Sequence, residues 1–292
     1  MVGSVFLTLL YQHLVRGVMD LNVIELEHLT RDYGCGKGIF DLSLNVKQGE
    51  VFGFLGPNGA GKTTTIRHLM GFIKAKSGKC LIDGMDCMKD RKAIQRKTGY
   101  LSGEISLFDE MTGDEYLSFV EKYRGEDSNK KKRDLIERFE LDTSVKIRKM
   151  SKGMKQKTGI VAAFMSDPEI LILDEPTSGL DPLMQQRFTS LINEEKKRQK
   201  TILMSSHIFE EVEKTCDRIG LIRGGRLSEV KNIEELRTQH SHKYTVFLES
   251  VEEAKKFAED FKGEVDGKMV TVRKMQTLEK IFMNYYEEDE NE

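Results

Sequence analysis

The sequence has few cysteines and almost no net charge. Its four cysteines (Cys35, Cys80, Cys87 and Cys216) are scattered, with no Cys-x-x-Cys pair and no histidine cluster. This pattern is typical of free thiols in a reducing cytoplasm, and it argues against a metal centre held by these residues. The 46 lysines and arginines nearly cancel the 48 aspartates and glutamates, so no overall field favours nucleic acid or an anionic membrane surface. The charge balance therefore weakens a DNA-binding interpretation.

The sequence also lacks a long hydrophobic run. Its most apolar stretch, residues 1–18, is interrupted by Gln12, His13 and Arg16 and is shorter than the roughly 20 residues that a spanning helix needs. It has neither the basic start nor the small-residue cleavage site of an export signal. We therefore expect residues 1–21 to form a poorly ordered extension; the alternative is an amphipathic segment on a membrane or partner. No other segment is apolar enough to span a bilayer, so a soluble protein is expected.

Residues 56–65, GPNGAGKTTT, match the phosphate-loop pattern G-x-x-x-x-G-K-[ST] completely. The loop follows the apolar run VFGFL, which predicts a buried strand, and precedes TTTIRHLMGF, which has helical spacing. Its glycines let successive backbone N–H groups converge on phosphate oxygens, and the helix start adds its positive end. Lys62 supplies a charge to the β- and γ-phosphates, and the Thr63 hydroxyl is placed for Mg²⁺. The candidate nucleotide-binding residues are Gly56, Pro57, Asn58, Gly59, Ala60, Gly61, Lys62, Thr63 and Thr64.

Two adjacent acids, Asp174 and Glu175, follow the apolar run ILIL. Asp174 is expected to hold Mg²⁺ directly or through water, and Glu175 to orient or deprotonate an attacking water. Because neighbouring side chains of a strand point to opposite faces, the pair must lie where the chain leaves the sheet. Pro176 is consistent with that exit. The simpler interpretation is an acidic turn at the end of a buried strand.

The order of the expected elements predicts an α/β fold with two additions to its core. VIELEHL and the alternating FDLSLNV predict an antiparallel β subdomain before the phosphate loop. A capping box of Thr112 and Glu115 marks helices of an inserted subdomain expected over residues 104–157. We therefore predict a P-loop NTPase core over residues 22–238 and a small C-terminal α/β appendage over residues 239–292, which ends in an acidic tail.

The motifs together resemble the ATP-binding cassette (ABC) family, the nucleotide-binding subunits of membrane transporters, over residues 22 to about 235. DEPTSGLDP (174–182) extends the acidic strand into a D-loop, and MSKGMKQK (150–157) stands in the place of the family signature. His207 stands in the place of the switch histidine, and Tyr33 matches the aromatic residue that stacks on adenine. Tyr33 alone would be an ordinary turn aromatic and His207 alone a structural histidine, so the specificity lies in the combination.

The resemblance implies ATP and Mg²⁺ as cofactors and a head-to-tail dimer, either a homodimer or a pseudo-symmetric heterodimer with another ABC subunit. Ser151 and Gly153 would face the γ-phosphate held by the opposite subunit, and Asp181 would contact that subunit. His207 would bond the γ-phosphate, with Glu175 the stronger candidate for the base. The residues alone indicate only that Ser151 can cap a helix whose N-terminal amides point at an anion.

The sequence departs from the family pattern at two places. Gly103 stands where glutamine is usual, and Glu104 beside it either reaches Mg²⁺ through water or is a surface acid. In the signature, Lys152 stands where glycine is usual and Met154 where glutamine is usual. These variants resemble a subset of export-type cassettes, including those associated with antibiotic resistance and with small-molecule or ion efflux.

The resemblance favours an ATPase subunit that drives export through an integral-membrane permease on a separate chain. The permease would contact residues 103–125, the chain would lie on the cytoplasmic face of the membrane, and no nucleic acid partner is expected. The alternative is a soluble ABC ATPase that acts on ribosomes or DNA, although such members usually carry two cassettes or long coiled coils. A P-loop kinase would need an acceptor pocket that the sequence does not show. The cargo and the role of the appendage are left open.

Overall fold

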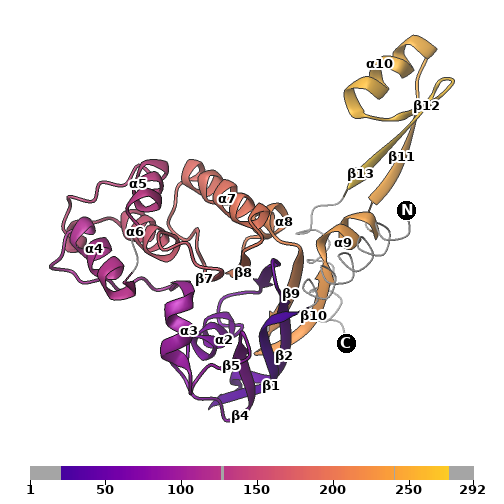
Figure 1. Ribbon diagram of the computed structural model, residues 1–292. Coiled ribbons are helices and arrows are strands. Elements are labelled where there is room, and N and C mark those ends of the chain that lie inside the picture. The colour runs from indigo at the N-terminus through magenta and orange to yellow at the C-terminus, as the bar shows by residue number, and fades with distance from the viewer. Residues whose placement is uncertain (1–20, 126–127, 240, 276–292) are drawn as a thin grey trace, which may run out of the picture. The chain divides into compact units, whose positions relative to one another are not determined.

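The computed structural model describes residues 21–125, 128–239 and 241–275 (Figure 1). The chain divides into two units, with the boundary between Val230 and Lys231. The predicted N-terminal extension, apart from its last residue, and the predicted acidic tail lie outside the described residues. Among the described helices, none has the length and hydropathy of a membrane-spanning segment.

The first unit contains two β-sheets. A four-stranded sheet has the order β2-β1-β4-β5, and a six-stranded sheet has the order β10-β9-β3-β8-β7-β6. The strands are β1 (Asn22–Gly34), β2 (Lys37–Lys47), β3 (Val51–Leu55), β4 (Ser77–Ile82), β5 (Met85–Asp86), β6 (Thr98–Leu101), β7 (Ile170–Asp174), β8 (Thr201–Ser206), β9 (Arg218–Arg223) and β10 (Arg226–Asn232). The smaller sheet is antiparallel, and β9, β3, β8, β7 and β6 run parallel. The predicted α/β class with an antiparallel subdomain is therefore confirmed.

The centre of the larger sheet is apolar on both faces. Every residue of β3, β7 and β8 is buried, as expected for parallel strands covered on both sides. Phe52, Phe54, Ile172 and Leu203 lie in one buried cluster that continues into the antiparallel sheet. This packing fixes the carboxyl ends of β3, β7 and β8, where the candidate site residues follow.

Helices join the strands and form the predicted inserted region. The helices of the first unit are α2 (Lys62–Leu69), α3 (Arg91–Lys97), α4 (Gly113–Arg124), α5 (Asn129–Arg138), α6 (Lys152–Phe164), α7 (Pro182–Lys197), α8 (Phe209–Thr215) and the 3₁₀ turn η1 (Ile147–Lys149). The capping box is confirmed: the Thr112 side chain accepts from the Glu115 N–H, and the Glu115 carboxylate accepts from the Thr112 N–H at 2.7 Å. Both bonds fix the start of α4.

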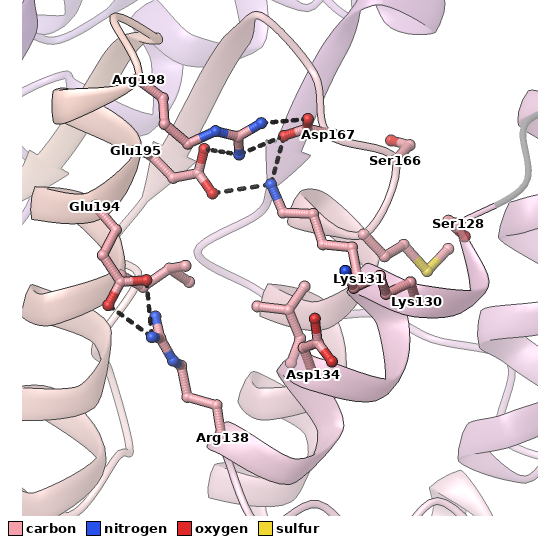
Figure 2. A pocket seen from close by; sticks show the side chains of 13 residues that line it. Ser128, Lys130, Lys131, Asp134, Arg138, Ser166, Asp167, Glu194, Glu195 and Arg198 are labelled. Carbon is pink, nitrogen blue, oxygen red and sulfur yellow. Dashed lines mark hydrogen bonds and ion pairs between the residues drawn. The ribbon is translucent and has the colours of Figure 1, made fainter.

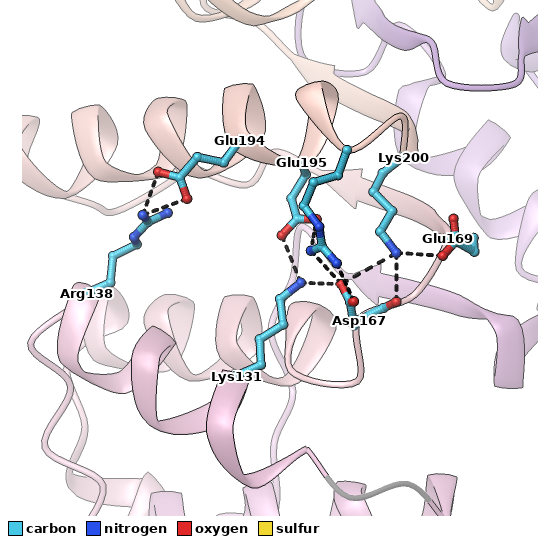
Figure 3. Close-up of polar contacts among 8 residues, drawn as sticks. Lys131, Arg138, Asp167, Glu169, Glu194, Glu195 and Lys200 are labelled. Carbon is cyan, nitrogen blue, oxygen red and sulfur yellow. Dashed lines mark hydrogen bonds and ion pairs between the residues drawn. The ribbon is translucent and has the colours of Figure 1, made fainter.

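A network of charged side chains joins the inserted helices to the core (Figure 3). Lys131 on α5 contacts Asp167, in the loop before β7, at 2.5 Å and Glu195 on α7 at 2.8 Å. Arg198 bonds the same two carboxylates, so Asp167 and Glu195 are shared between α5 and the end of α7. Arg138, at the end of α5, pairs with Glu194, the neighbour of Glu195 on α7. The inserted region is therefore held to the core by polar contacts as well as by packing.

The junction of α5, α7 and the loop before β7, called the seam below, lines an open pocket of about 780 Å³ (Figure 2). Its lining comes from α5, α7 and the loop between α6 and β7. Lys131, Asp167, Glu195 and Arg198 line it and are paired with one another. None of the residues that the sequence proposes for nucleotide or metal binding belongs to its lining.

The second unit begins at Lys231, within β10, and continues through α9 (Ile233–Gln239) into a small α/β module. Its sheet has the order β11-β13-β12 and is antiparallel. The elements are β11 (Ser241–Phe247), α10 (Val251–Phe261), β12 (Glu264–Asp266) and β13 (Met269–Met275). Ala254 and Ala258 of α10 pack with Val270 of β13 in a small core. Residues 276–292 of the predicted appendage lie outside the described residues.

Candidate active site

The phosphate loop lies between the end of β3 and the start of α2, as the sequence predicts. Its glycines have steric reasons to be there: a Cβ on Gly56 would lie 2.3 Å from the Ile222 carbonyl oxygen, and Gly61 has φ +114°. Gly61 is also the N-cap of α2, so no side chain caps this helix. The first N–H groups of α2 are thus available to an anion, which is the arrangement that favours phosphate.

Lys62 is buried and folded back over the loop. Its side chain is 5% exposed, and Nζ lies 3.0 Å from Oε1 of Glu175. Nζ also donates to the carbonyl oxygens of Gly56, at 2.5 Å, and Pro57, at 3.2 Å. A buried ammonium group needs such partners because burying a charge without them is costly. The lysine of the loop and the second acid of β7 therefore meet in one cluster.

Asp174 is the last residue of β7 and is fully buried. Its Oδ1 accepts a hydrogen bond of 2.5 Å from the Ser205 hydroxyl on β8. Within the described structure, its Oδ2 is buried and has no hydrogen-bond partner. A buried carboxylate oxygen without a donor is costly unless a cation binds it, and carboxylate and hydroxyl oxygens suit Mg²⁺. Asp174 therefore fits the predicted metal site, and Thr63, the second residue of α2, stays a predicted hydroxyl ligand.

Glu175 faces the same site because the backbone turns at this residue. Its φ of +48° is in the left-handed region, which is uncommon for a residue with a side chain. The turn is held by the Glu175 N–H, which donates to the Ser205 hydroxyl at 3.0 Å. Glu175 Oε2 lies 2.5 Å from Nδ1 of His207, so the structure brings Lys62, Glu175 and His207 together. This contact leaves Nε2 as the ring nitrogen of His207 that can face a phosphate oxygen.

Two side chains that support the acids were not predicted from the sequence. Ser205 contacts both Asp174 and the Glu175 backbone through one hydroxyl group. Gln156 on α6 is 2% exposed, and its amide donates to the carbonyl oxygens of Pro176, at 2.7 Å, and Glu175, at 3.3 Å. The sequence signal was position alone: Ser205 lies two residues before His207 and Gln156 lies within MSKGMKQK, which does not reveal these partners.

The predicted signature residues lie at the start of α6. Ser151 is the N-cap and accepts from the Met154 N–H at 3.2 Å. A Cβ on Gly153 would lie 2.8 Å from the Gly179 carbonyl oxygen, so glycine permits a close approach to the loop before α7. Lys152, one of the departures from the family pattern, donates to the Ser178 hydroxyl at 3.1 Å. The start of α6 is thus packed against the D-loop of the same chain.

Three predicted site residues make their contacts outside the cluster of Lys62, Asp174, Glu175 and His207, namely Asp181, Tyr33 and Glu104. Asp181 is the N-cap of α7 and accepts from the Met184 N–H at 3.0 Å. Tyr33, near the end of β1, is half exposed, with the Arg31 guanidinium 5.1 Å from its ring centroid. These contacts leave the predicted roles of Asp181 and Tyr33 as predictions.

The loop after β6 places Gly103, rather than the Glu104 side chain, against the first acid. A Cβ on Gly103 would lie 3.0 Å from Asp174 Oδ2. The Glu104 side chain is 91% exposed, and its Oε2 lies 3.7 Å from Arg67. Glu104 is therefore a surface acid in this structure, and the predicted contact of Glu104 with Mg²⁺ through water stays a prediction.

Comparisons with known proteins indicate the family and the fold of the chain. The family model described as ABC transporter matches residues 39–178. The bacitracin transport ATP-binding protein BcrA of Bacillus licheniformis is 40% identical over 228 residues, which are 77% of this chain and 74% of that protein. A solved ATP-binding subunit of an ABC transporter superimposes with a TM-score of 0.69 at 31% identity, covering 74% of this chain and 92% of that one.

A dimeric bacterial ABC transporter cassette shares the fold, with a TM-score of 0.65 at 22% identity over 72% of this chain and 98% of that one. These matches are transporter subunits, and they give no support to the alternative of an ATPase acting on ribosomes or DNA. The chain belongs to the ABC transporter family as one of its ATP-binding subunits, and it is an ATPase.

Proposed function

We propose that this ATPase hydrolyses Mg²⁺-bound ATP with Glu175 as the base, His207 as a ligand of the γ-phosphate, and Asp174 and Thr63 as metal ligands. The observation that carries the proposal is the cluster at the ends of β3, β7 and β8, where Lys62, Glu175 and His207 are in contact. When bound, Mg²⁺ would neutralise charge on the phosphates. The half-buried carboxylate of Glu175 is then positioned to take a proton from water.

Nucleotide binding must rearrange one contact of this cluster. Lys62 now pairs with Glu175, whereas a phosphate-loop lysine binds the β- and γ-phosphates. As the ammonium group moves to the phosphates, the Glu175 carboxylate loses its cationic partner and becomes available to a water molecule. The Glu175 to His207 contact at 2.5 Å keeps the base near the γ-phosphate ligand during this exchange.

The signature residues support a head-to-tail dimer, either of two copies or with another ABC subunit. Ser151 and Gly153 form a helix start that can bind an anion, yet their contacts within the chain are with α6 and the D-loop. A second chain would bring this helix start to the γ-phosphate, with Asp181 at the interface and Tyr33 against the adenine.

Light scattering of the Glu175→Gln variant tests the dimer. The substitution slows hydrolysis, so the variant should form dimers with ATP and remain monomeric without it. The double variant Glu175→Gln, Ser151→Ala is the matched comparison and should dimerise more weakly. A Glu175→Gln protein that stays monomeric at saturating ATP would contradict the proposed head-to-tail dimer.

We further propose that a membrane permease on a separate chain binds the aromatic surface of the inserted region. Phe108, Phe119 and Tyr123 are 52%, 43% and 70% exposed, and their rings lie edge to face or stacked. Exposed, clustered aromatic side chains are enriched at protein interfaces. This surface lies within residues 103–125, the segment expected to contact the permease, and would place the chain on the cytoplasmic face of the membrane.

Export is favoured by the similarity to a bacitracin transport protein. Purification of the tagged chain from native membranes, followed by identification of the integral proteins that accompany it, tests the partner. Phe119→Asp should lose that partner while keeping basal ATP hydrolysis. Recovery with ribosomes in place of a membrane protein would contradict the proposal.

A further inference from the structure

A buried acid that the mechanism above does not use contacts two residues that lie close to the catalytic residues in the sequence. Glu211 is on α8, four residues after His207, and is 7% exposed. Its Oε2 accepts hydrogen bonds from the Ser206 hydroxyl at 2.8 Å and the Thr177 hydroxyl at 3.2 Å. Within the described residues, its Oε1 is buried without a hydrogen-bond partner. Burying a carboxyl group in this way is costly, which calls for a functional reason.

Both hydroxyl groups belong to loops that carry proposed catalytic residues. Ser206 directly precedes His207, and Thr177 follows Glu175 by two residues. Ser206 Oγ also accepts from the Ile208 N–H at 2.9 Å, so the backbone on both sides of His207 is tied to one hydroxyl. Ser206 and Thr177 are themselves buried, at 1% and 4% exposure. The Glu211 carboxyl group therefore joins the end of β8 to the exit of β7.

We propose that Glu211 is a positioning residue for ATP hydrolysis, which holds the His207 loop and the Glu175 loop at the separation that their contact requires. It acts through Ser206 and Thr177. The inference rests on the proposed roles of Glu175 and His207, whose contact at 2.5 Å is the geometry that Glu211 maintains. Without this tie, either loop can shift, and small shifts of catalytic groups can slow a reaction on the order of 100-fold.

The electrostatic surroundings give the proposal a distinctive readout. Burial raises the pKa of Glu211 to about 7, against hydrogen bonds from Ser206 and Thr177 that lower it. The nearby Glu175 raises the pKa of Glu211 and His207 lowers it. Other titratable groups around α8 are the Cys216 thiol, whose pKa burial raises to about 12, Glu213, the pair Glu210 and Lys214, and the pair Lys196 and Asp217. Glu211 thus changes charge near neutral pH, and its ionised form accepts stronger hydrogen bonds.

Two substitutions distinguish the effect of the Glu211 hydrogen bonds from the effect of its charge. Glu211→Ala removes both hydrogen bonds, and kcat should fall about tenfold or more with KM for ATP within about twofold of wild type. Glu211→Gln keeps an acceptor oxygen, so it should recover most of kcat. We expect kcat of the wild type to rise between pH 6 and pH 8 as Glu211 ionises, and because glutamine cannot ionise, this rise should be smaller in Glu211→Gln. Glu210→Gln, the exposed neighbour on α8, is the control and should match wild type in both measurements.

The inference is wrong if Glu211→Ala keeps the wild-type kcat across this pH range, or if its loss of kcat only matches the folded fraction lost by circular dichroism. If the alanine variant does not fold, the pH profile of Glu211→Gln decides, and an unchanged profile overturns the proposal. A Glu175→Gln variant that hydrolyses ATP like wild type would instead sink the proposed function. If Glu175→Gln fails to hydrolyse ATP while the Glu211 variants hydrolyse it like wild type, only the inference about Glu211 is wrong.

Discussion

Replacing Ser205 with alanine removes one hydroxyl group that serves both acids of the site. The hydroxyl donates to Oδ1 of Asp174 at 2.5 Å and accepts from the Glu175 N–H at 3.0 Å. Alanine leaves Asp174, a fully buried carboxylate, with no donor on Oδ1, in addition to the unpartnered Oδ2. The Glu175 N–H keeps a second acceptor, the Ser205 carbonyl oxygen at 3.2 Å.

The expected loss of stability is therefore set by one hydrogen bond to a charged, buried group, about 2 kcal/mol in the free energy of unfolding. A urea titration followed by circular dichroism measures it, since the chain has no tryptophan. Ser190→Ala is the matched control: its hydroxyl donates to the Gln186 carbonyl oxygen on the exposed side of α7, and its loss should cost under about 0.5 kcal/mol.

Hydrolysis should respond to the same change. Asp174 and Glu175 both lose a fixed partner, so kcat of Ser205→Ala should fall about tenfold or more, while Ser190→Ala keeps the wild-type value. Equal stability of the two alanine variants, together with an unchanged kcat for Ser205→Ala, would refute the idea that this hydroxyl holds the acid pair.

Two further substitutions test other parts of the structure. Gly103→Ala would place a Cβ 3.0 Å from Asp174 Oδ2, so it should cost about 1–3 kcal/mol and weaken Mg²⁺-dependent hydrolysis; wild-type activity would show that Asp174 is not confined there. Asp167→Asn tests the seam: burial raises the pKa of Asp167, but hydrogen bonds from Arg198 and Lys131 outweigh it and hold that pKa well below 3.8. The stabilisation from these contacts is present above pH 3.8 and is lost as the pH falls through the lowered pKa of Asp167. Asp167→Asn should therefore lose about 1 kcal/mol in the free energy of unfolding at neutral pH and unfold with a weaker acid dependence. An acid titration identical to that of the wild type would contradict this expectation.

The motifs with fixed spacing were the part of the site that could be predicted from the sequence. The phosphate loop, the acids after ILIL and the capping box of Thr112 and Glu115 depend on neighbours within a few residues. Their local chemistry therefore determines their place on a strand end or a helix start. Full burial of β3 and β7 also followed from continuous apolar runs.

Partners that lie far apart in the sequence could not be predicted. Ser205 reaches Asp174 across 31 positions, and Gln156 reaches Pro176 across 20. Glu211 reads as one of several acids in FEEVEK, and only the fold shows that its carboxyl group faces inward while Glu210 faces solvent. The left-handed backbone of Glu175 is equally invisible in the sequence, because φ +48° is uncommon for glutamate.

Single-turnover hydrolysis of Mg²⁺-ATP by Glu175→Gln, compared with wild type, tests most directly whether this carboxylate is the base. ATP binding to the variant, measured separately, should stay within about threefold of wild type, since the phosphate loop and Asp174 are intact. Phosphate formation should slow on the order of 100-fold or more because the general base is lost. Phosphate formation at the wild-type rate would contradict the account.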